Sequence, residues 1–382
     1  MLRHPQFRGL EKPIVNALER FRACMAHLPP DRPPLDLGAT TLTGMRPACG
    51  QRLLDVLGFT GASQPTNSGV DERILQWAGV GFRGVGGIVD LPSPHTRRLS
   101  TVSAIDCWGV GRDRIAGEWQ ITEAPLRGAT REDLAAFPWP EPRIDERALM
   151  RWEAQAQALQ ATGEHVVIAE HPVYGILELG CWMCGYDDFL IRLAADPDFV
   201  RDFFDRVLAI QLDVIDTYYR VLGPYVHLTT SGDDFGTQGG PLISPATFEA
   251  LIAPYMKARI ERTKAIARCY YWHHTCGSVF KLLPQLIACG VDILNPVQVS
   301  AAGMAPERLK ETFGNTLVFW GGVDVQHVLP FASPDQVREE VRHLIAVLGR
   351  DGGLVVAPTH ELQDDIPPEA IIAWIEAARD GS

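Results

Sequence analysis

From His165 to the C-terminus, short apolar runs rich in β-branched and aromatic residues alternate with segments of helical periodicity. Strands that are separated by helices of about ten to fifteen residues are typical of parallel βαβ units, so the pattern predicts an α/β fold with a parallel sheet. The expected strands cover residues 165–170, 226–230, 268–274, 291–295, 316–320 and 353–357. The expected helices cover residues 197–221, 278–288, 306–313 and 333–348, and a last helix starts at 367.

Two more strands, at 34–38 (PLDLG) and near 82–89, would complete a set of eight. We therefore expect a single (β/α)8 TIM-type barrel domain over residues 1–382, with long βα loops. The alternative is an open doubly wound sheet, but the first strand is not followed by a glycine-rich phosphate loop. Residues 1–30 are expected to form an N-terminal helical extension, and residues 90–150 a decorated connection.

Composition excludes several classes of protein. The chain is 46% hydrophobic and 21% charged, as in ordinary globular proteins. With 35 basic and 47 acidic residues its net charge is −12, so we do not expect nucleic acid as a partner. No apolar run is long enough to span a membrane, and we expect a cytoplasmic protein. The eight cysteines are scattered, and we interpret them as reduced thiols.

The segments that follow the expected strands are unusually polar, and active sites of barrels lie at these strand ends. His274 and Cys276 end one strand two residues apart, and in an extended chain residues i and i+2 point to the same side. An imidazole and a thiolate together suit Zn²⁺. His360 ends a later strand on the same rim, so the predicted metal ligands are His274, Cys276 and His360. His273 is expected to face the opposite way.

Four other strand-end residues are candidates for catalytic roles. Asp233 and Asp234 form a pair of carboxylates that could orient a ligating histidine, supply acid/base chemistry or cap the following turn. Gln298 and Asp324 follow later strands, and we expect both to line the pocket, together with the Glu170 and His171 pair. The motif at 181–184 has CxxC spacing, but no second CxxC accompanies it, which excludes a four-cysteine zinc site.

With these residues in view, the chain resembles the uroporphyrinogen decarboxylase superfamily over nearly its full length. The best matching tracts are 232–245 (GDDFGTQGGPLISP), 274–279 (HTCGSV), 292–298 (DILNPVQ) and 321–324 (GGVD). Weaker matches are 30–36, the segment around 106–109 and 137–140. The resemblance implies the barrel fold but does not select one reaction.

The superfamily has two well-known branches. True decarboxylases have an arginine-rich pocket without a cofactor and an Arg-Gln-Ala-Gly-Arg tract, whereas this chain has GMRPACG at 44–50, with Arg46 as its single arginine. The other branch consists of zinc-dependent methyltransferases that act with corrinoid proteins and use a His-x-Cys and a later cysteine as ligands. His274 and Cys276 match the first two ligands, and His360 stands where that branch places the cysteine.

The resemblance therefore implies a zinc-dependent methyltransferase that moves a methyl group between a corrinoid protein and a thiol or methyl-ether substrate. One thiolate and two imidazoles would leave Zn²⁺ with a formal charge of about +1, which makes the metal a stronger Lewis acid than two thiolates would. The sequence has no Asp-x-His-x-x-Gly motif for cobalamin, so the corrinoid is expected on a separate protein. The alternatives are a metal-free decarboxylase or other lyase on the same scaffold, and a barrel that only binds a tetrapyrrole or corrinoid partner.

Overall fold

A curled parallel sheet forms the centre of the molecule. The computed structural model describes residues 16–115 and 117–381. Its seven-stranded sheet has the order β1-β6-β7-β8-β9-β10-β11, so neighbours in this sheet follow one another along the chain, and every pair is parallel. The strands are β1 (Phe82–Gly86), β6 (Val166–Glu170), β7 (Leu228–Thr229), β8 (Tyr270–His274), β9 (Ile293–Val297), β10 (Val318–Val323) and β11 (Leu354–Pro358).

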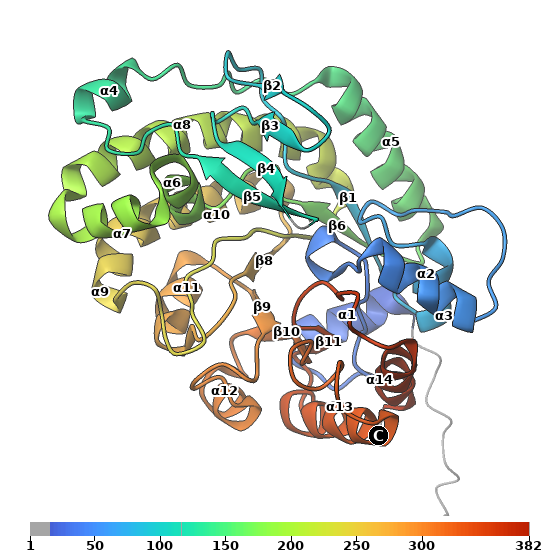
Figure 1. Cartoon of the computed structure of the whole chain (residues 1–382). Coiled ribbons are helices and arrows are strands. Elements are labelled where there is room, and N and C mark those ends of the chain that lie inside the picture. The colour runs from blue at the N-terminus through green and yellow to red at the C-terminus, as the bar shows by residue number, and fades with distance from the viewer. Residues whose placement is uncertain (1–15, 116, 382) are drawn as a thin grey trace, which may run out of the picture.

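Helices alternate with these strands and cover the outside of the sheet (Figure 1). The long α8 packs against α10, and α13 packs against α14. Local sequence sets the helix starts: Ser333 caps α13 in a reciprocal capping box with Gln336, and Asp196 caps α8 just before its first residue, a proline. The helices between and after these strands are α5 (Glu146–Thr162), α6 (Ile176–Cys184), α7 (Tyr186–Ala195), α8 (Pro197–Leu222), α9 (Pro245–Thr247), α10 (Ala253–Ala267), α11 (Leu283–Cys289), α12 (Pro306–Phe313), α13 (Pro334–Leu348) and α14 (Pro368–Asp380).

The expected alternation is confirmed from 165 onward, and the strand expected near 82–89 is β1. The strand expected at 34–38 is not formed. Leu35 makes one isolated parallel bridge to Val356 of β11, with a hydrogen bond from the Asp36 N–H to the Val356 carbonyl (2.9 Å). Two consecutive prolines remove backbone donors before this point, and the chain turns at Gly38, where φ is 76°. The described residues thus form a curled seven-stranded sheet, and the eight-stranded closed barrel is not confirmed.

Aromatic side chains fill the interior of the curled sheet. Trp272 of β8 stacks on Trp320 of β10 with ring centroids 4.4 Å apart, and the ring centroid of Phe82 of β1 lies 4.6 Å from that of Trp320. The Trp320 indole N–H donates to the buried carboxyl group of Asp36 (3.0 Å). The contact between Phe82 and Trp320 joins β1, at one end of the sheet order, to β10, which is next to the other end, so side chains meet across the interior where no backbone ladder joins these strands.

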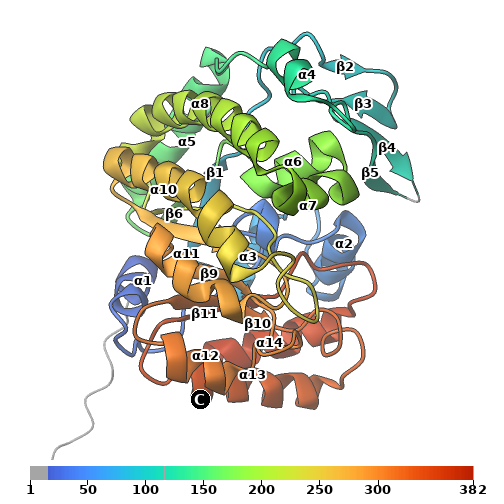
Figure 2. The same ribbon diagram turned by 90° about the vertical axis from the view of Figure 1, so that its left-hand side faces the viewer.

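Residues 90–150 contain a small domain-like element that the sequence pattern did not predict. A four-stranded antiparallel sheet consists of β2 (Arg97–Arg98), β3 (Ser103–Ile105), β4 (Gly111–Ile115) and β5 (Glu118–Glu123), in that order. It is followed by α4 (Arg131–Ala136). Figures 1 and 2 show this sheet at one end of the molecule beside α6, and Arg112 of β4 lies over the ring of Trp182 of α6 at 5.2 Å.

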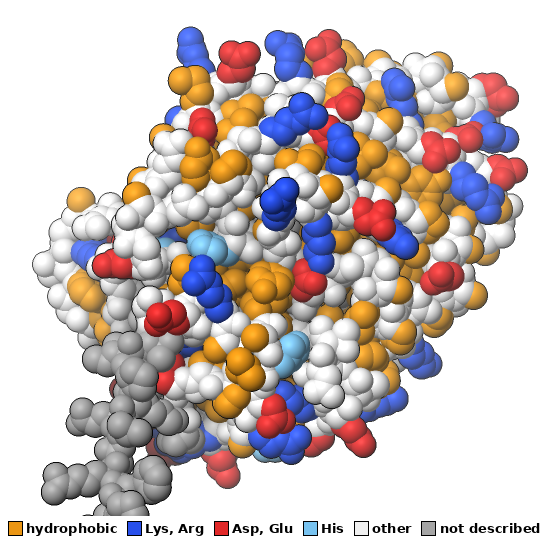
Figure 3. Space-filling view, turned by 180° about the vertical axis from the view of Figure 1, so that it is seen from behind, with side chains coloured by type: hydrophobic (Ala, Val, Ile, Leu, Met, Phe, Trp, Pro, Cys, Tyr) orange, Lys and Arg blue, Asp and Glu red, His pale blue; other side chains and the backbone are white. Residues whose placement is uncertain are grey.

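The segment before β1 packs beside β11 and also reaches the carboxyl end of β6, where Thr41 donates a hydrogen bond to Glu170. Its helices are α1 (Ala17–Met25), α2 (Pro47–Val56) and α3 (Glu72–Ala78), and α2 contacts α14. Half of the expected N-terminal extension, residues 1–15, lies outside the described residues. No helix in the described part of the chain is both long and apolar enough to cross a membrane. On the face seen in Figure 3, basic and acidic side chains are interspersed.

Candidate metal centre and cavity

The candidate centre lies where β7 and β8 end. Because both strands are parallel neighbours, the residues that follow them meet at one edge of the sheet, and an isolated parallel bridge joins Gly232 to His274 there. This bridge places Asp234, two residues after Gly232, opposite Cys276, two residues after His274. The arrangement explains how side chains far apart in the sequence reach one point.

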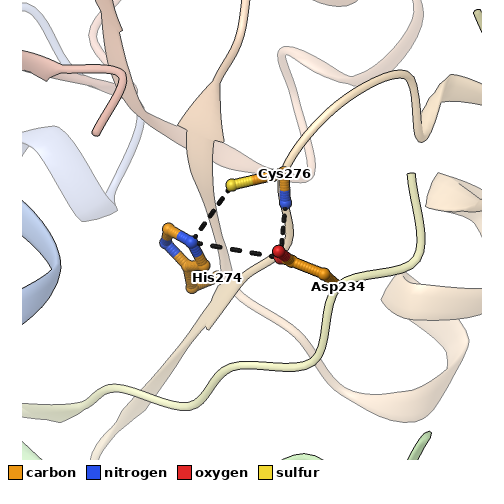
Figure 4. A group of neighbouring side chains, drawn as sticks. All are labelled: Asp234, His274 and Cys276. Atoms are coloured by element: carbon orange, nitrogen blue, oxygen red, sulfur yellow. Dashed lines mark hydrogen bonds and ion pairs between the residues drawn. The ribbon is translucent and has the colours of Figure 1, made fainter. Parts of the chain in front are cut away.

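Asp234, His274 and Cys276 form a compact cluster of metal-ligand atoms (Figure 4). One ligand atom from each side chain lies within 4.8 Å of the other two. The Cys276 Sγ is 3.3 Å from the His274 Nε2, and this nitrogen is 4.0 Å from the Asp234 Oδ1. The Cys276 N–H donates to the same Asp234 oxygen (2.8 Å), which orients the carboxylate toward the cluster.

Asn295 of β9 fixes the orientation of the His274 ring. The His274 Nδ1 lies 2.6 Å from the Asn295 Oδ1, and the Asn295 side-chain amide donates to the Trp320 carbonyl (3.2 Å). Because the amide nitrogen is used by that second bond, the Asn295 oxygen accepts from Nδ1–H, and the His274 Nε2 keeps its lone pair on the side of Cys276 and Asp234. Hydrogen bonds of this kind orient histidines that bind metals.

His273 faces away from the cluster, as expected from the strand geometry. Its Nδ1 lies 2.8 Å from the Ser231 Oγ, and its ring stacks near Phe235. Burial lowers the pKa of His273 to about 3, so the imidazole is neutral. His360 is closer to the cluster: its ring centroid is 6.3 Å from that of His274, and its side chain is exposed at the end of β11.

Three of the four candidate catalytic residues hold backbone groups in place. The buried Asp233 carboxylate accepts the N–H groups of Leu177 (3.0 Å) and Glu178 (2.9 Å) at the start of α6. Asp324 accepts from two N–H groups of the loop after β10, at 2.6 and 3.0 Å. Gln298 accepts from the N–H of Gly277, next to Cys276, at 2.8 Å. Only Asp234, the fourth, lies in the cluster itself.

A cavity of about 460 Å³ adjoins the cluster, and Asp234 and His274 form part of its wall. Its other lining residues come from the ends of β1, β6 and β7, from the start of α6 and from the segment before β1. They are Thr41, Leu42, Asn67, Gly86, Gly87, Ile88, Glu170, His171, Val173, Tyr174, Gly175, Glu178, Thr230, Ser231 and Gly232. Gln298 and Asp324, which we expected to line a pocket, are not among them.

Carboxyl groups dominate the electrostatics of this cavity. Burial raises the pKa of Glu170, and burial together with the nearby carboxyl groups of Asp233 and Asp234 raises the pKa of Glu178 to about 9. Glu170 is held by Asn67 (2.6 Å) and by the Thr41 hydroxyl (2.6 Å). Burial, with the nearby charges of Asp234 and Glu178, also raises the pKa of the Cys276 thiol. A bound cation would reverse this effect, because it stabilises the thiolate.

The cysteines of the CxxC motif take no part in the cluster. Cys181 and Cys184 are free thiols inside α6, and burial raises the pKa of both. The sequence analysis gave no role to Asn295, although it lies in the matching tract 292–298, and it did not name Glu178. Asn295 could have been found from the register, since it pairs directly with His274 across β8 and β9. Glu178 comes from a helix, and no strand-end pattern points to it.

Comparison with known proteins agrees with an α/β enzyme fold. The family model described as uroporphyrinogen decarboxylase (URO-D) matches residues 129–381. This match covers more than half of the 382 residues, and the chain therefore belongs to the uroporphyrinogen decarboxylase family. No curated protein matches the chain significantly in sequence.

A solved methyltransferase structure shares the fold. A methyltransferase from Methanosarcina mazei superposes with a TM-score of 0.64 at 15% identity, over 96% of this chain and 98% of that one. An endo-1,4-β-xylanase from Penicillium canescens has a TM-score of 0.39 at 10% identity, over 63% of this chain and 81% of the xylanase. At these identities the likeness to the methyltransferase concerns the fold, and that to the xylanase only part of the chain.

Proposed function

We propose that this chain is a zinc-dependent methyltransferase that moves a methyl group between a small molecule in the cavity and a corrinoid carried by a separate protein. The observation that carries the proposal is the cluster of Asp234, His274 and Cys276, whose ligand atoms lie within 4.8 Å of one another. Two of its members, Asp234 and His274, line a cavity of about 460 Å³. Membership of the uroporphyrinogen decarboxylase family and the fold shared with a methyltransferase support it.

The donor set fits zinc. A thiol, an imidazole with a free Nε2 and a carboxylate are the three ligand types that Zn²⁺ takes in proteins, and three protein ligands leave one position open. When bound, zinc acts as a Lewis acid that lowers the pKa of a substrate thiol or polarises the oxygen of a methyl ether. We propose His274 and Cys276 as two ligands and Asp234 as the third, with His360 as the alternative third ligand that the sequence pattern favours.

The other residues of the site keep these donors in position. Asn295 holds the His274 ring in one tautomer, and Gln298 fixes the backbone beside Cys276. Asp233 ties the start of α6 to the segment after β7, and this holds Glu178 at the cavity wall. We propose that Asp233, Gln298 and Asp324 act as positioning residues, because each binds backbone N–H groups.

The alternative reaction, decarboxylation of a tetrapyrrole, fits the cavity poorly. Such a substrate carries several carboxylates, and a pocket that binds it needs cationic side chains. The residues that line the described cavity include three with carboxyl groups and no lysine or arginine. Arg46, the arginine of the N-terminal tract, is paired with Glu361 at 3.2 Å.

The test combines metal analysis with turnover. The purified protein is expected to contain about one zinc per chain, and Cys276→Ala is expected to lose it, whereas Cys289→Ala, which removes a buried thiol in α11, should retain it. With zinc bound, the protein should transfer methyl from methylcobalamin to a thiol, or from a methyl ether to reduced cobalamin, and a chelator should stop the reaction. Full activity after complete removal of the metal, or efficient decarboxylation of a porphyrinogen, would overturn the proposal. A protein that binds corrinoid without turnover would be a binding module instead.

A further inference from the structure

A second hollow lies beside the cavity of the candidate site, which we call the inner cavity. This outer hollow has a volume of about 510 Å³, and the two share Ile88 and Tyr174 in their walls. The rest of its lining lies within residues 89–107, together with Trp119 of β5. Except for Tyr174, all of these residues precede the segment 129–381 that matches the family model, so family membership assigns the outer hollow no role.

One face of the small antiparallel sheet belongs to this hollow. Arg98 of β2 pairs with Ala104 of β3, which pairs with Arg112 of β4, and residues paired in this way point to the same side. Arg112 lies over the ring of Trp182, so this face is turned toward α6, beside which Figure 2 shows the sheet. The register of β4 and β5 puts Trp119 on the same face. Arg98 and Trp119 thus reach the outer hollow from one side, and both line it.

The outer hollow carries positive charge that is not paired within the described residues. Arg97 and Arg98 line it, both are exposed, and neither forms an ion pair with a described residue. Of the two acidic residues in its lining, Asp106 is paired with Arg112 and also accepts two backbone N–H groups. The other, Asp90, is exposed. Two unpaired arginines and one unpaired aspartate leave this hollow with a net positive charge.

Apolar side chains stay exposed around the same hollow. Trp119 is 49% exposed and Ile88 is 44% exposed. The ring of Tyr174 packs edge-on against Trp182, with centroids 4.9 Å apart, so it is held in place. Large apolar side chains that are exposed in a concave surface are typical of a binding site. With Arg98 beside them, they suit a ligand that has an apolar body and a carboxylate, because a guanidinium donates charge-assisted hydrogen bonds to that group.

The inner cavity has the opposite character. Three residues with carboxyl groups line it, and no lysine or arginine does. The charge of Arg259, a buried residue of α10, acts on Asp233 and His171, but Arg259 is not part of the cavity wall. A ligand with one anionic end therefore places that end in the outer hollow and its uncharged end in the inner cavity.

Resting on the proposed function, we propose that the substrate is an elongated, largely apolar methyl ether or thiol that ends in a carboxylate. Its reacting end lies in the inner cavity beside Asp234 and His274, its apolar part passes along Ile88 and Tyr174, and its carboxylate binds Arg98. Volumes of about 460 and 510 Å³ give such a molecule room. The several carboxylates of a tetrapyrrole, in contrast, would also meet the carboxyl groups of the inner cavity.

The test compares acids with their uncharged amides at two chain lengths. Isothermal titration calorimetry on the purified protein at neutral pH, with its zinc content measured, uses 8-methoxyoctanoate and 8-methoxyoctanamide as the long pair and methoxyacetate and methoxyacetamide as the short pair. We expect the long acid to bind about fivefold more tightly than the long amide, as is typical of an exposed ion pair. The short pair should show no such preference, because its carboxylate cannot lie in both hollows. High salt should reduce the preference of the long pair.

Variants of exposed side chains identify the contacts. Arg98→Gln should reduce the preference for the long acid to about twofold or less and leave the affinity of the long amide unchanged. Arg342→Gln, which removes an exposed arginine on α13, is the matched control and should keep the full preference. Trp119→Ala should weaken the long acid and the long amide alike by severalfold, whereas Trp119→Phe should retain most of the affinity. Substitutions at exposed positions such as these rarely affect folding.

Three results would overturn the inference: equal binding of the long acid and amide, an equal preference for the acid in the short pair, or an unchanged preference in Arg98→Gln. The expected preference in a protein that holds no zinc and transfers no methyl group would contradict only the proposed function. Zinc-dependent methyl transfer without any preference for the long acid would contradict only the inference.

Discussion

Replacing Asn295 is the sharpest test of how the fold prepares His274. The His274 Nδ1 lies 2.6 Å from the Asn295 Oδ1, and both side chains are buried, with 7% and 1% of their surfaces exposed. Asn295→Ala removes the acceptor and leaves a buried N–H without a partner, which costs about 1–3 kcal/mol. Without this acceptor the His274 ring can rotate, so its Nε2 is no longer held facing Cys276.

The expected result for Asn295→Ala is zinc affinity about 10 to 100-fold lower, as is typical for partners of metal-binding histidines. Competition with a chromophoric chelator measures it. Asn295→Asp keeps an acceptor for Nδ1–H and should recover most of the affinity, and Asn315→Ala, at an exposed turn after α12, should bind zinc as the unmodified protein does. If Asn295→Ala binds zinc with unchanged affinity while its fold is intact, the argument that this hydrogen bond orients the ligand is refuted.

Further expected outcomes follow from other contacts. Cys276→Ser should reduce zinc content well below one per chain while Asp234→Asn reduces affinity less, as metal analysis after dialysis can show, because a thiolate is the softest donor in the set. Asp233→Ala should lower the free energy of unfolding by about 1–2 kcal/mol in urea titrations, since it removes the cap of α6, and a purely catalytic role would predict no such loss. Burial lowers the pKa of His171 well below its unfolded value, so the unfolded chain takes up the proton first and stability should fall as the pH drops below about 6.5. His171→Gln should flatten that acid slope in pH-dependent unfolding, and an unchanged slope would show that other groups cause it.

The sequence was sufficient for the alternation of strands and helices because each element has a strong local signal. The parallel strands from β8 to β11 are short buried apolar runs, and α12 begins and ends at the residues expected, 306 and 313. The segment at 34–38 looked like a strand because its apolar residues alternate with polar ones. Prolines and a turn at Gly38 limit its pairing to one bridge. The alternation of apolar and polar residues does not reveal either restriction. The small sheet of β2 to β5 has partly exposed strands without a clear buried face, so no hydrophobic pattern marked it.

The sequence predicted which residues follow the strand ends, but it predicted the direction of their side chains only within an extended strand. The i, i+2 rule placed His274 and Cys276 together and turned His273 away, as the structure has them. The same rule could not separate Asp233 from Asp234. Asp233 points to the start of α6 and Asp234 to the cluster, because consecutive residues after β7 face opposite sides. Both aspartates were acid/base candidates in the sequence analysis, because the sequence does not show that α6 begins next to Asp233.

The identity of the third ligand decides the charge of the centre. Zn²⁺ with Cys276, His274 and His360 has a formal charge of about +1, whereas the cluster of Asp234, His274 and Cys276 has about 0, because the carboxylate adds a negative charge. A neutral centre is the weaker Lewis acid, so the choice between Asp234 and His360 would set how strongly a bound zinc lowers the pKa of a substrate thiol. Metal analysis of Asp234→Asn and His360→Ala separates the two choices, because only loss of the true third ligand should weaken zinc binding.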